Sequence, residues 1–333
     1  MFERRRWMLA VGLLVCVLAA NAKTKTKQGG DMLDVARDAF ETSDYAKAVQ
    51  LLQAAAAKAP QNGDIHLLLA KSYYELQEHD AAINSAERAV AIDPKRSVYH
   101  EWLGKAYGEK ASHAMMFSAM SLARKTHKEF EIAVQLDERN FSAGQALVEF
   151  YCSAPGIVGG GEEKARPLIE KLAVLDAAEG HYAAGNCRRQ KKDFAAADAE
   201  FALALESDPK SADLIYDIGD YAMKHNQPER LARVADLGQR VAPADQRAKF
   251  YRAVGLILKN EWQEEAEHLL REYLVRAPVR SDHPRPALVR EWLGRLYESQ
   301  GNKEAAKKEY QTALGLDPKS KTAHEALKRV EKN

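Results

Sequence analysis

The sequence predicts an all-helical fold in which one helical hairpin recurs about eight times and a last helix closes the array. Three observations predict it. Apolar residues recur at helical spacing, small residues recur where paired helices would cross, and prolines recur at a fixed interval along the 333-residue chain.

The clearest copy of the hairpin spans Gly63–Arg96. Its two halves carry apolar stripes at three- or four-residue spacing: Ile65, Leu69 and Tyr73, then Ala82, Ala86, Ala89 and Val90. Such stripes are typical of two amphipathic helices. We expect Asp80 to cap the second helix with its side chain, and Pro94 to end it, because a proline disfavours helical geometry at the residue before it.

The same order of residues returns along the chain, with Leu293-Gly294, Tyr297, Gly301-Asn302, Ala306, Tyr310 and Asp317-Pro318 as the strongest second copy. Pro60 to Pro94 and Pro209 to Pro243 each span one period of roughly 34 residues. In period, small residues, aromatics and closing Asp-Pro, the chain resembles the tetratricopeptide repeat family. The resemblance implies a right-handed α-solenoid, a superhelix whose first helices line a concave face.

The elements follow in order from these signals. Residues 1–22 are a signal peptide and 23–30 a flexible lead-in, while 31–333 form the superhelix. The expected repeat units are 29–62, 63–96, 97–138, 141–177, 178–211, 212–245, 246–280 and 287–320, with a capping helix over 321–331.

The N-terminus has the order of a secretory signal. Arg4-Arg5-Arg6 precedes an apolar run from Trp7 to Ala20, and small residues lead to a cleavage site after Ala22. The run is shorter than the roughly 20 apolar residues that span a bilayer, which disfavours a membrane anchor. We therefore expect a periplasmic or secreted protein without stable membrane insertion.

Charge argues against a nucleic-acid partner. The whole chain has 49 basic and 48 acidic residues, and loss of residues 1–22 leaves 46 and 47, a net charge of −1. Nucleic-acid binders usually show a basic excess or a dense basic stripe. Here both signs alternate along the helices.

Two insertions interrupt the period. The third unit contains Ala111–Met120 (ASHAMMFSAM), which we interpret as lengthened helices joined by an apolar turn, packed over the inner groove near Trp102. A soft-metal site using His113 and the methionines is the alternative. The fourth unit contains APGIVGGG at 154–161, whose glycines permit the positive φ of a tight turn. This insertion resembles that of a subset of exported bacterial tetratricopeptide proteins.

Beyond the signal, the chain keeps Cys152 and Cys187. Both lie late in the first helices of neighbouring units, and the compartment permits a disulfide. Pairing and burial as two separate small apolar side chains both stay open from sequence alone.

The sequence lacks recognisable catalytic sets. It contains no His-Glu-x-x-His, no Cys-x-x-Cys and no Gly-x-Ser-x-Gly, and its ten histidines are scattered. We expect neither an enzyme nor a cofactor.

In the resembled family, the residue after the small crossing residue of each first helix points into the concave face. By that rule Arg37, Lys71, Lys105 and Arg295 present cations. The peptide-binding residues expected on this face are Arg37, Phe40, Lys71, Tyr74, Trp102, Lys105, Tyr182, Asn186, Tyr216, Trp292 and Arg295. Glu41, Glu75 and Glu109 follow the first three cations by four residues, so intrahelical pairing is the competing interpretation.

The sequence thus predicts an exported scaffold that holds a protein or peptide along its concave face, in assembly or maintenance of the cell envelope. The alternatives are an enzyme with an unrecognised site in the groove, or a metal-handling protein that uses residues 111–120.

Overall fold

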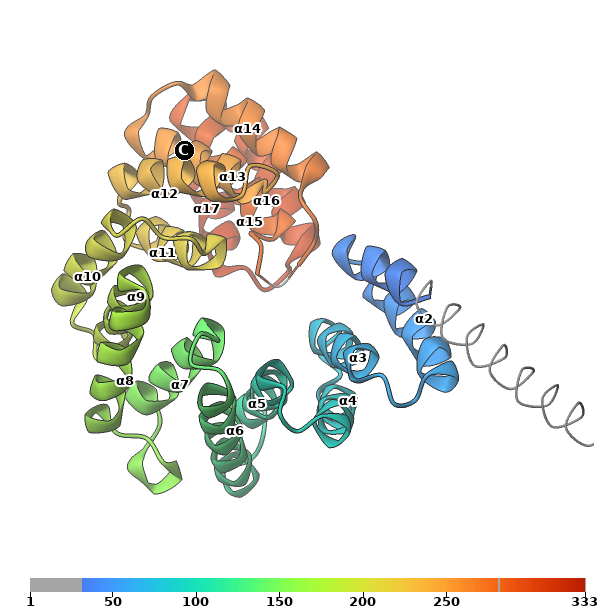
Figure 1. Ribbon diagram of the computed structural model, residues 1–333. Coiled ribbons are helices and arrows are strands. Elements are labelled where there is room, and N and C mark those ends of the chain that lie inside the picture. Colours follow the sequence, from blue (N-terminus) through green and yellow to red (C-terminus); the bar gives the residue numbers. More distant parts are fainter. Residues whose placement is uncertain (1–31, 281, 333) are drawn as a thin grey trace, which may run out of the picture. The chain divides into compact units, whose positions relative to one another are not determined.

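The computed structural model describes residues 32–280 and 282–332, so the signal and lead-in expected over residues 1–30 lie outside the described part. Within those ranges all regular structure is helical and no β-strand occurs (Figure 1). The chain divides into two compact units, each treated by itself below. Of the described residues, unit 1 holds 32–147 and 155–159, and unit 2 holds 148–154, 160–280 and 282–332.

Unit 1 is a series of hairpins in which each helix packs on the next. It begins with a helix over residues 32–41. Its further elements are α2 (Tyr45–Lys58), α3 (Gly63–Glu75), α4 (His79–Ile92), α5 (Ser97–Ser112), α6 (Met116–Leu136) and a short 3-10 turn, η1 (Gly156–Val158). The first helices α3 and α5 also contact each other, as expected for helices that share one face of a solenoid.

Unit 2 continues the same pattern. The helix α7 (Phe141–Ser153) is divided between the units. The others are α8 (Glu162–Leu175), α9 (Ala177–Gln190), α10 (Phe194–Glu206), α11 (Ala212–Lys224), α12 (Pro228–Val241), α13 (Arg247–Lys259), α14 (Gln263–Arg276), α15 (Pro286–Ser299), α16 (Lys303–Leu316) and α17 (Lys321–Lys332). Again the first helices α11, α13 and α15 contact one another in sequence.

Small residues allow the paired helices to approach closely. A Cβ on Gly104 would lie 2.6 Å from the Phe130 ring, and one on Gly294 would lie 2.4 Å from the Tyr310 ring. Neither distance leaves room for a methyl group, so each glycine faces an aromatic ring of the second helix. This is the packing that the spacing of small residues predicts.

Asp80 does not cap α4. The helix begins at His79, its N-cap is Glu78, and no side chain accepts a hydrogen bond at that end. Asp80 therefore lies inside the first turn, where its carboxylate pairs with Lys110 instead. The prediction is wrong because the helix begins two residues earlier than a cap at Asp80 requires.

The insertion over residues 111–120 forms the end of α5, a short turn and the start of α6, which is 21 residues long. Lengthened helices were expected. The expected packing over the groove near Trp102 is wrong, because Met115, Met116 and Phe117 are exposed. The turn extends the hairpin outward and nothing among the described residues covers these side chains.

The glycine-rich insertion makes the tight turn that its composition predicts. Gly159 and Gly161 have φ values of +107° and +148°. A side chain at Gly160 would meet the Ala154 carbonyl oxygen at 1.9 Å. Substitution at any of the three glycines would therefore strain the turn.

Cys152 and Cys187 form a disulfide in unit 2, with their Cα atoms 5.4 Å apart. The bond joins the second half of α7 to α9. Of the two alternatives left open by the sequence, the structure shows pairing.

Candidate binding surface

The strongest grouping of expected site residues lies on unit 1, where α3 and α5 present neighbouring side chains. We call Lys71, Tyr74, Trp102 and Lys105 the Trp102 cluster. The Nζ atoms of Lys71 and Lys105 each lie 4.8 Å from the centre of the Trp102 ring. The Tyr74 ring meets the indole edge-on, with centroids 5.7 Å apart. Each ammonium–indole contact contributes about 0.5–1 kcal/mol at a partly exposed site.

A buried carboxylate holds Lys105 in place. The Lys105 ammonium donates to Glu101 at 2.6 Å and to the Ser142 hydroxyl at 3.0 Å. Ser142 and Asn140 also donate to the Glu101 carboxylate. Burial alone would raise the pKa of Glu101, but the Lys105 charge and these hydrogen bonds lower it below its ordinary value. Glu101 therefore stays ionised and anchors the ammonium.

This arrangement leaves Lys105 with binding capacity. An ammonium has three N–H donors, and Glu101 and Ser142 account for two of them. A third donor beside a partly exposed indole suits an acceptor oxygen on a partner. Sequence reasoning missed Glu101, although its position four residues before Lys105 is the helical pairing distance.

Intrahelical pairing, the competing interpretation, does occur at two of the three cations, but with acids other than the expected ones. Arg37 pairs with Asp34 at 3.4 Å, and Lys105 pairs with Glu101 at 2.6 Å. Glu109 faces Tyr74 instead. Burial, followed by the charge of Glu109, raises the pKa of Tyr74 to about 12.

Several expected surface residues prove to be core residues. Phe40 is 8%, Tyr216 2% and Trp292 3% exposed, so none of these rings offers a face to a partner. Arg247 lies 4.4 Å above the Tyr216 ring, and Arg295 lies 4.4 Å above the Trp292 ring. These two arginines cover the rings.

On unit 2 the first-helix face carries acids and tyrosines. Tyr182 donates to Asp217 at 2.6 Å, and Tyr251 donates to Asp220 at 2.6 Å. The expected site residue Asn186 is buried next to Tyr182. We call Tyr182, Asp217, Asp220 and Tyr251 the Tyr–Asp cluster.

The carboxyls of the Tyr–Asp cluster hold their protons unusually well. Burial raises the pKa of Asp217 to about 6, and the nearby negative charges of Asp220 and Asp213 add to the effect. Burial likewise raises the pKa of Asp220. The face of unit 2 is thus acidic in character, whereas the Trp102 cluster of unit 1 is basic and aromatic.

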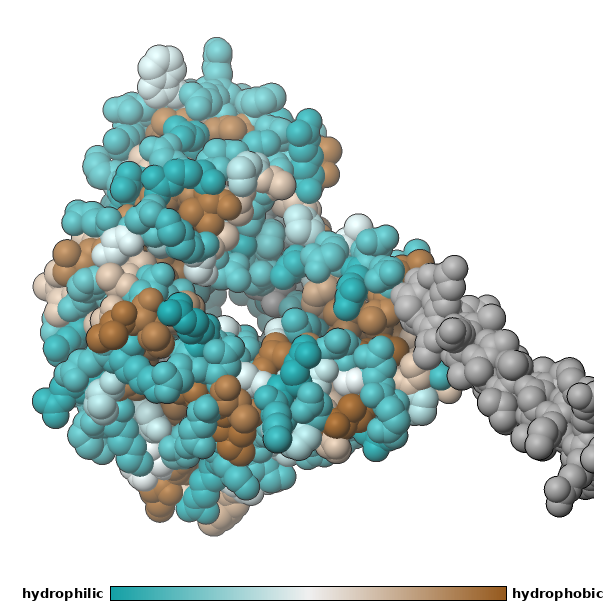
Figure 2. Space-filling model, viewed as in Figure 1, coloured by the Kyte–Doolittle hydropathy of each residue, from teal (hydrophilic) through white to brown (hydrophobic). Residues whose placement is uncertain are grey.

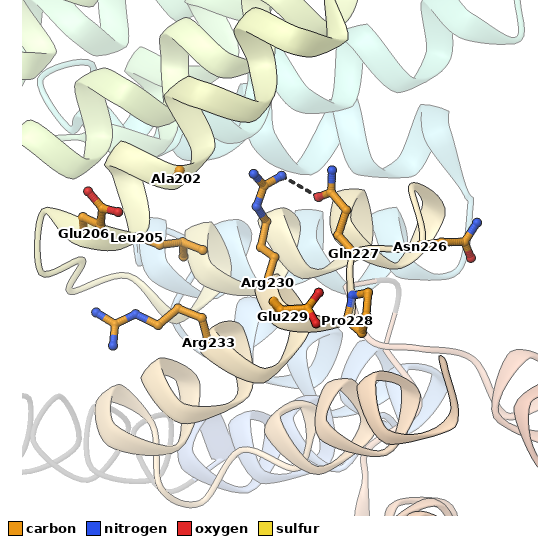
Figure 3. A pocket seen from close by; sticks show the side chains of 9 residues that line it. All are labelled: Ala202, Leu205, Glu206, Asn226, Gln227, Pro228, Glu229, Arg230 and Arg233. Carbon is orange, nitrogen blue, oxygen red and sulfur yellow. Dashed lines mark hydrogen bonds between the residues drawn. The ribbon is translucent and has the colours of Figure 1, made fainter. Parts of the chain in front are cut away.

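A groove of about 740 Å³ lies in unit 2 between α10 and α12 (Figure 3). Arg230 crosses it and donates to Asp198 at 2.6 Å and to Gln227 at 2.5 Å. These bonds tie α12 to α10, so we assign Arg230 a structural role. None of the expected site residues lines this groove.

The described residues contain no group of three or more His, Cys, Asp or Glu side chains arranged to hold a metal ion. Nor does any helix within the described ranges combine the length and hydropathy needed to cross a bilayer.

Comparison with known proteins places repeats of one family on three segments. Models of the tetratricopeptide repeat match residues 39–105, and residues 178–211 and 289–320. These segments are similar to the tetratricopeptide repeat, and the expected all-helical α-solenoid fold is confirmed. Proteins built from such repeats typically serve as scaffolds for protein interaction. No curated protein matches the sequence significantly.

Three solved structures have a chain path similar to that of this protein. A tetratricopeptide repeat protein from Parabacteroides merdae is 13% identical, with a TM-score of 0.42 over 92% of this chain and 99% of its own. A chain of the APC/C hetero-tetramer Cut9–Hcn1 is 15% identical, with a TM-score of 0.48 over 90% of this chain and 55% of its own. Pseudomonas aeruginosa PilF is 13% identical, with a TM-score of 0.42 over 79% of this chain and 95% of its own. With scores below 0.5, these likenesses carry no argument about function.

Proposed function

We propose that this protein is a non-catalytic, exported scaffold that holds an extended acidic segment of a protein partner against the Trp102 cluster of unit 1. The observation that carries the proposal is the partly exposed Trp102 indole with two ammonium groups 4.8 Å from its centre. Aromatic side chains that stay accessible beside fixed cations are typical anchors of protein interfaces.

The chemistry of the cluster favours a carboxylate or carbonyl acceptor. Glu101 fixes the Lys105 ammonium before a partner arrives, so little side-chain entropy is lost on binding. Charges at the edge of such a site mainly accelerate association, while the desolvated ring slows dissociation.

Export and a role in the cell envelope rest on residues 1–22 and on the resemblance of the APGIVGGG insertion to that of exported bacterial tetratricopeptide proteins. The disulfide between Cys152 and Cys187 supports the export proposal, because disulfides persist in oxidising compartments. N-terminal sequencing of the protein recovered from cells tests it. We expect the chain to begin at Lys23; intact Met1 in a membrane fraction would contradict export.

A peptide experiment tests the binding surface. The probes are a fluorescent glutamate–tyrosine copolymer and a lysine–tyrosine copolymer of equal length. We expect preference for the acidic probe, and loss of that preference in Lys71→Gln/Lys105→Gln. The matched control is Lys47→Gln/Lys95→Gln, which removes the same charge from exposed positions of unit 1.

The kinetics separate the two contributions. The lysine variant should associate more slowly and depend less on salt. Trp102→Ala should instead raise the dissociation rate by about tenfold, the equivalent of about 1.4 kcal/mol. If the control variant loses as much affinity as Lys71→Gln/Lys105→Gln, the effect is general charge and the Trp102 cluster is not the binding surface.

A further inference from the structure

The hairpin formed by α5 and α6 ends in a tip whose one ionisable side chain is His113. Between Lys110 and Arg124 the chain contains no Asp, Glu, Lys or Arg, and its larger side chains are Met115, Met116, Phe117, Met120 and Leu122. We call residues 111–123 the hairpin tip. It contains the Met-rich insertion, which is not part of the binding surface proposed above.

The helix register shows that the tip projects beyond its neighbour. Gly104 of α5 faces Phe130 of α6, and Gly108 faces Thr126. Because the helices are antiparallel, Ser112 at the end of α5 lies level with Leu122. Residues 116–121 therefore extend past the end of α5 by about 9 Å, at 1.5 Å per residue.

The tip exposes three consecutive apolar side chains, together with the polar side chains of His113, Ser118 and Ser121. Met115 is 87%, Met116 70% and Phe117 84% exposed. Consecutive residues at a helix start point about 100° apart, so these three side chains fan out around the helix end. A groove on a protein receives side chains from one side of a helix. A lipid layer surrounds an inserted tip and can receive all three.

In Figure 2 apolar side chains form separate patches on a largely hydrophilic surface. Exposed large apolar side chains in consecutive positions are uncommon on soluble proteins and mark a site of contact.

The charges behind the tip fit an anionic surface. Arg124, Lys125 and Lys128 follow it on α6, and the first acid of that helix is Glu129. The start of α6 has no acid in its first turn and no side-chain cap, so the positive end of the helix dipole faces outward.

Acids on the adjacent elements lie near the base of the tip: Glu78 lines a hollow with His113 and Ala114, and two further acids form ion pairs. Asp80 of α4 pairs with Lys110. Glu109 of α5 lies 3.8 Å from His113, and it is level with Lys125 in the helix register, so it stays about 13 Å behind Met116.

We propose that the hairpin tip inserts reversibly into the surface of an anionic lipid bilayer. Met115, Met116 and Phe117 enter the boundary between headgroups and acyl chains, while Arg124, Lys125 and Lys128 remain at the level of the phosphates. The depth matches the 5–10 Å over which interfacial helices bury their apolar face. The attachment is peripheral, and it does not depend on a protein partner.

A local fluorescence readout tests insertion in the full chain. Phe117→Trp places an indole at the tip, and Val174→Trp places one at a position of unit 2 that is equally open, 87% exposed. The probe is vesicles of equal parts phosphatidylglycerol and phosphatidylcholine, with brominated lipid as quencher. After subtraction of the parent signal, we expect a blue shift and quenching for Phe117→Trp and neither for Val174→Trp.

A binding measurement tests which side chains are responsible. We expect Met115→Ser/Met116→Ser/Phe117→Ser to lower vesicle affinity by at least about tenfold, since three apolar side chains lose their burial. Val174→Ser/Val275→Ser, which removes two exposed apolar side chains from unit 2, should change it little. Arg124→Gln/Lys128→Gln should lower vesicle affinity by about tenfold or more and remove most of the salt dependence of binding.

Three results would overturn the proposal. They are an unshifted, unquenched indole at position 117, a triple serine variant that binds vesicles as tightly as the parent, and equal binding of the parent tip to pure phosphatidylcholine. A protein that is captured through the tip while vesicles leave the position-117 indole unchanged would assign this surface to a protein partner instead.

Discussion

Asp217 in the Tyr–Asp cluster couples folding of unit 2 to pH. The residue keeps solvent contact, and its carboxyl accepts a hydrogen bond from the Tyr182 hydroxyl at 2.6 Å, which by itself lowers the pKa. Burial has the larger effect and raises the pKa from an ordinary 3.8 to about 6. The folded state therefore binds a proton more tightly than the unfolded state does. The resulting stability is fully present below about pH 4 and is lost as pH rises through about 6.

Asp217→Asn should remove this dependence, because asparagine still accepts a hydrogen bond from Tyr182 and carries no charge. We expect the variant to unfold at higher denaturant than the parent at pH 7.5, and the difference to shrink towards pH 4. Equilibrium urea unfolding at several pH values measures it. Glu325→Gln, on the exposed side of α17, is the control. A difference that stays constant with pH would contradict the pKa shift.

The residue scale is also where sequence reasoning reached its limit. Trp102 and Trp292 both precede a helical glycine by two residues, yet only Trp102 remains partly exposed. Tyr182 and Tyr216 both precede one by three residues, yet Tyr216 is buried. Periodicity fixes the direction of a side chain on its own helix. It does not specify which residue of the next hairpin covers it, as Arg247 does for Tyr216.

At the scale of elements, the disulfide joins α9 to the short C-terminal part of α7 that belongs to the same unit. Only residues 148–153 of α7 belong to that unit. The linked cysteines are 35 residues apart, and closing a loop of that length stabilises a fold by about 3–4 kcal/mol through the unfolded chain.

Cys152→Ser/Cys187→Ser should therefore lower the free energy of unfolding of unit 2 by about 3 kcal/mol. Hydrogen exchange resolved by peptide measures it: protection in α9 should fall, while protection in α3 to α5 stays as in the parent. Reduction of the parent protein should reproduce the loss. Unchanged exchange in α9 after reduction would show that helix packing alone holds this element.

The elements themselves were largely predictable, because each depends on local patterns. Apolar stripes and closing prolines specify the hairpins, and a run free of Gly and Pro from Ser118 to Leu136 predicted the long helix α6. The path of the insertion was not predictable. An apolar composition favours burial, but whether any surface lies within reach of Met115 depends on helix length and register, and here the longer α6 carries the turn outward.

At the scale of the whole molecule, a repeat array depends on its ends. Each hairpin covers the next, so the last one needs an outer layer. The helix α17 supplies it by burying Ala323, Ala326 and Val330, and its polar residues are equally engaged. Arg329 donates two hydrogen bonds to Glu298, at 2.7 and 2.8 Å, and Thr322 donates one to Glu291 at 2.5 Å.

Deletion of residues 321–333 should therefore destabilise unit 2 by more than the lost apolar contact. Glu291 is 6% exposed, and its carboxylate loses the hydroxyl of Thr322 while the Ser320 hydroxyl remains. Loss of a hydrogen bond to a charged group costs about 1.5–3 kcal/mol, in addition to the re-exposed face of α15 and α16. Hydrogen exchange should show α15 and α16 opening first, and unit 1 should remain unchanged. When the deletion is combined with Glu291→Gln, part of the lost stability should be recovered, because the glutamine amide is uncharged and does not leave a carboxylate short of one partner. If α15 and α16 keep their protection after the deletion, the array is stabilised within each hairpin and α17 is not a cap.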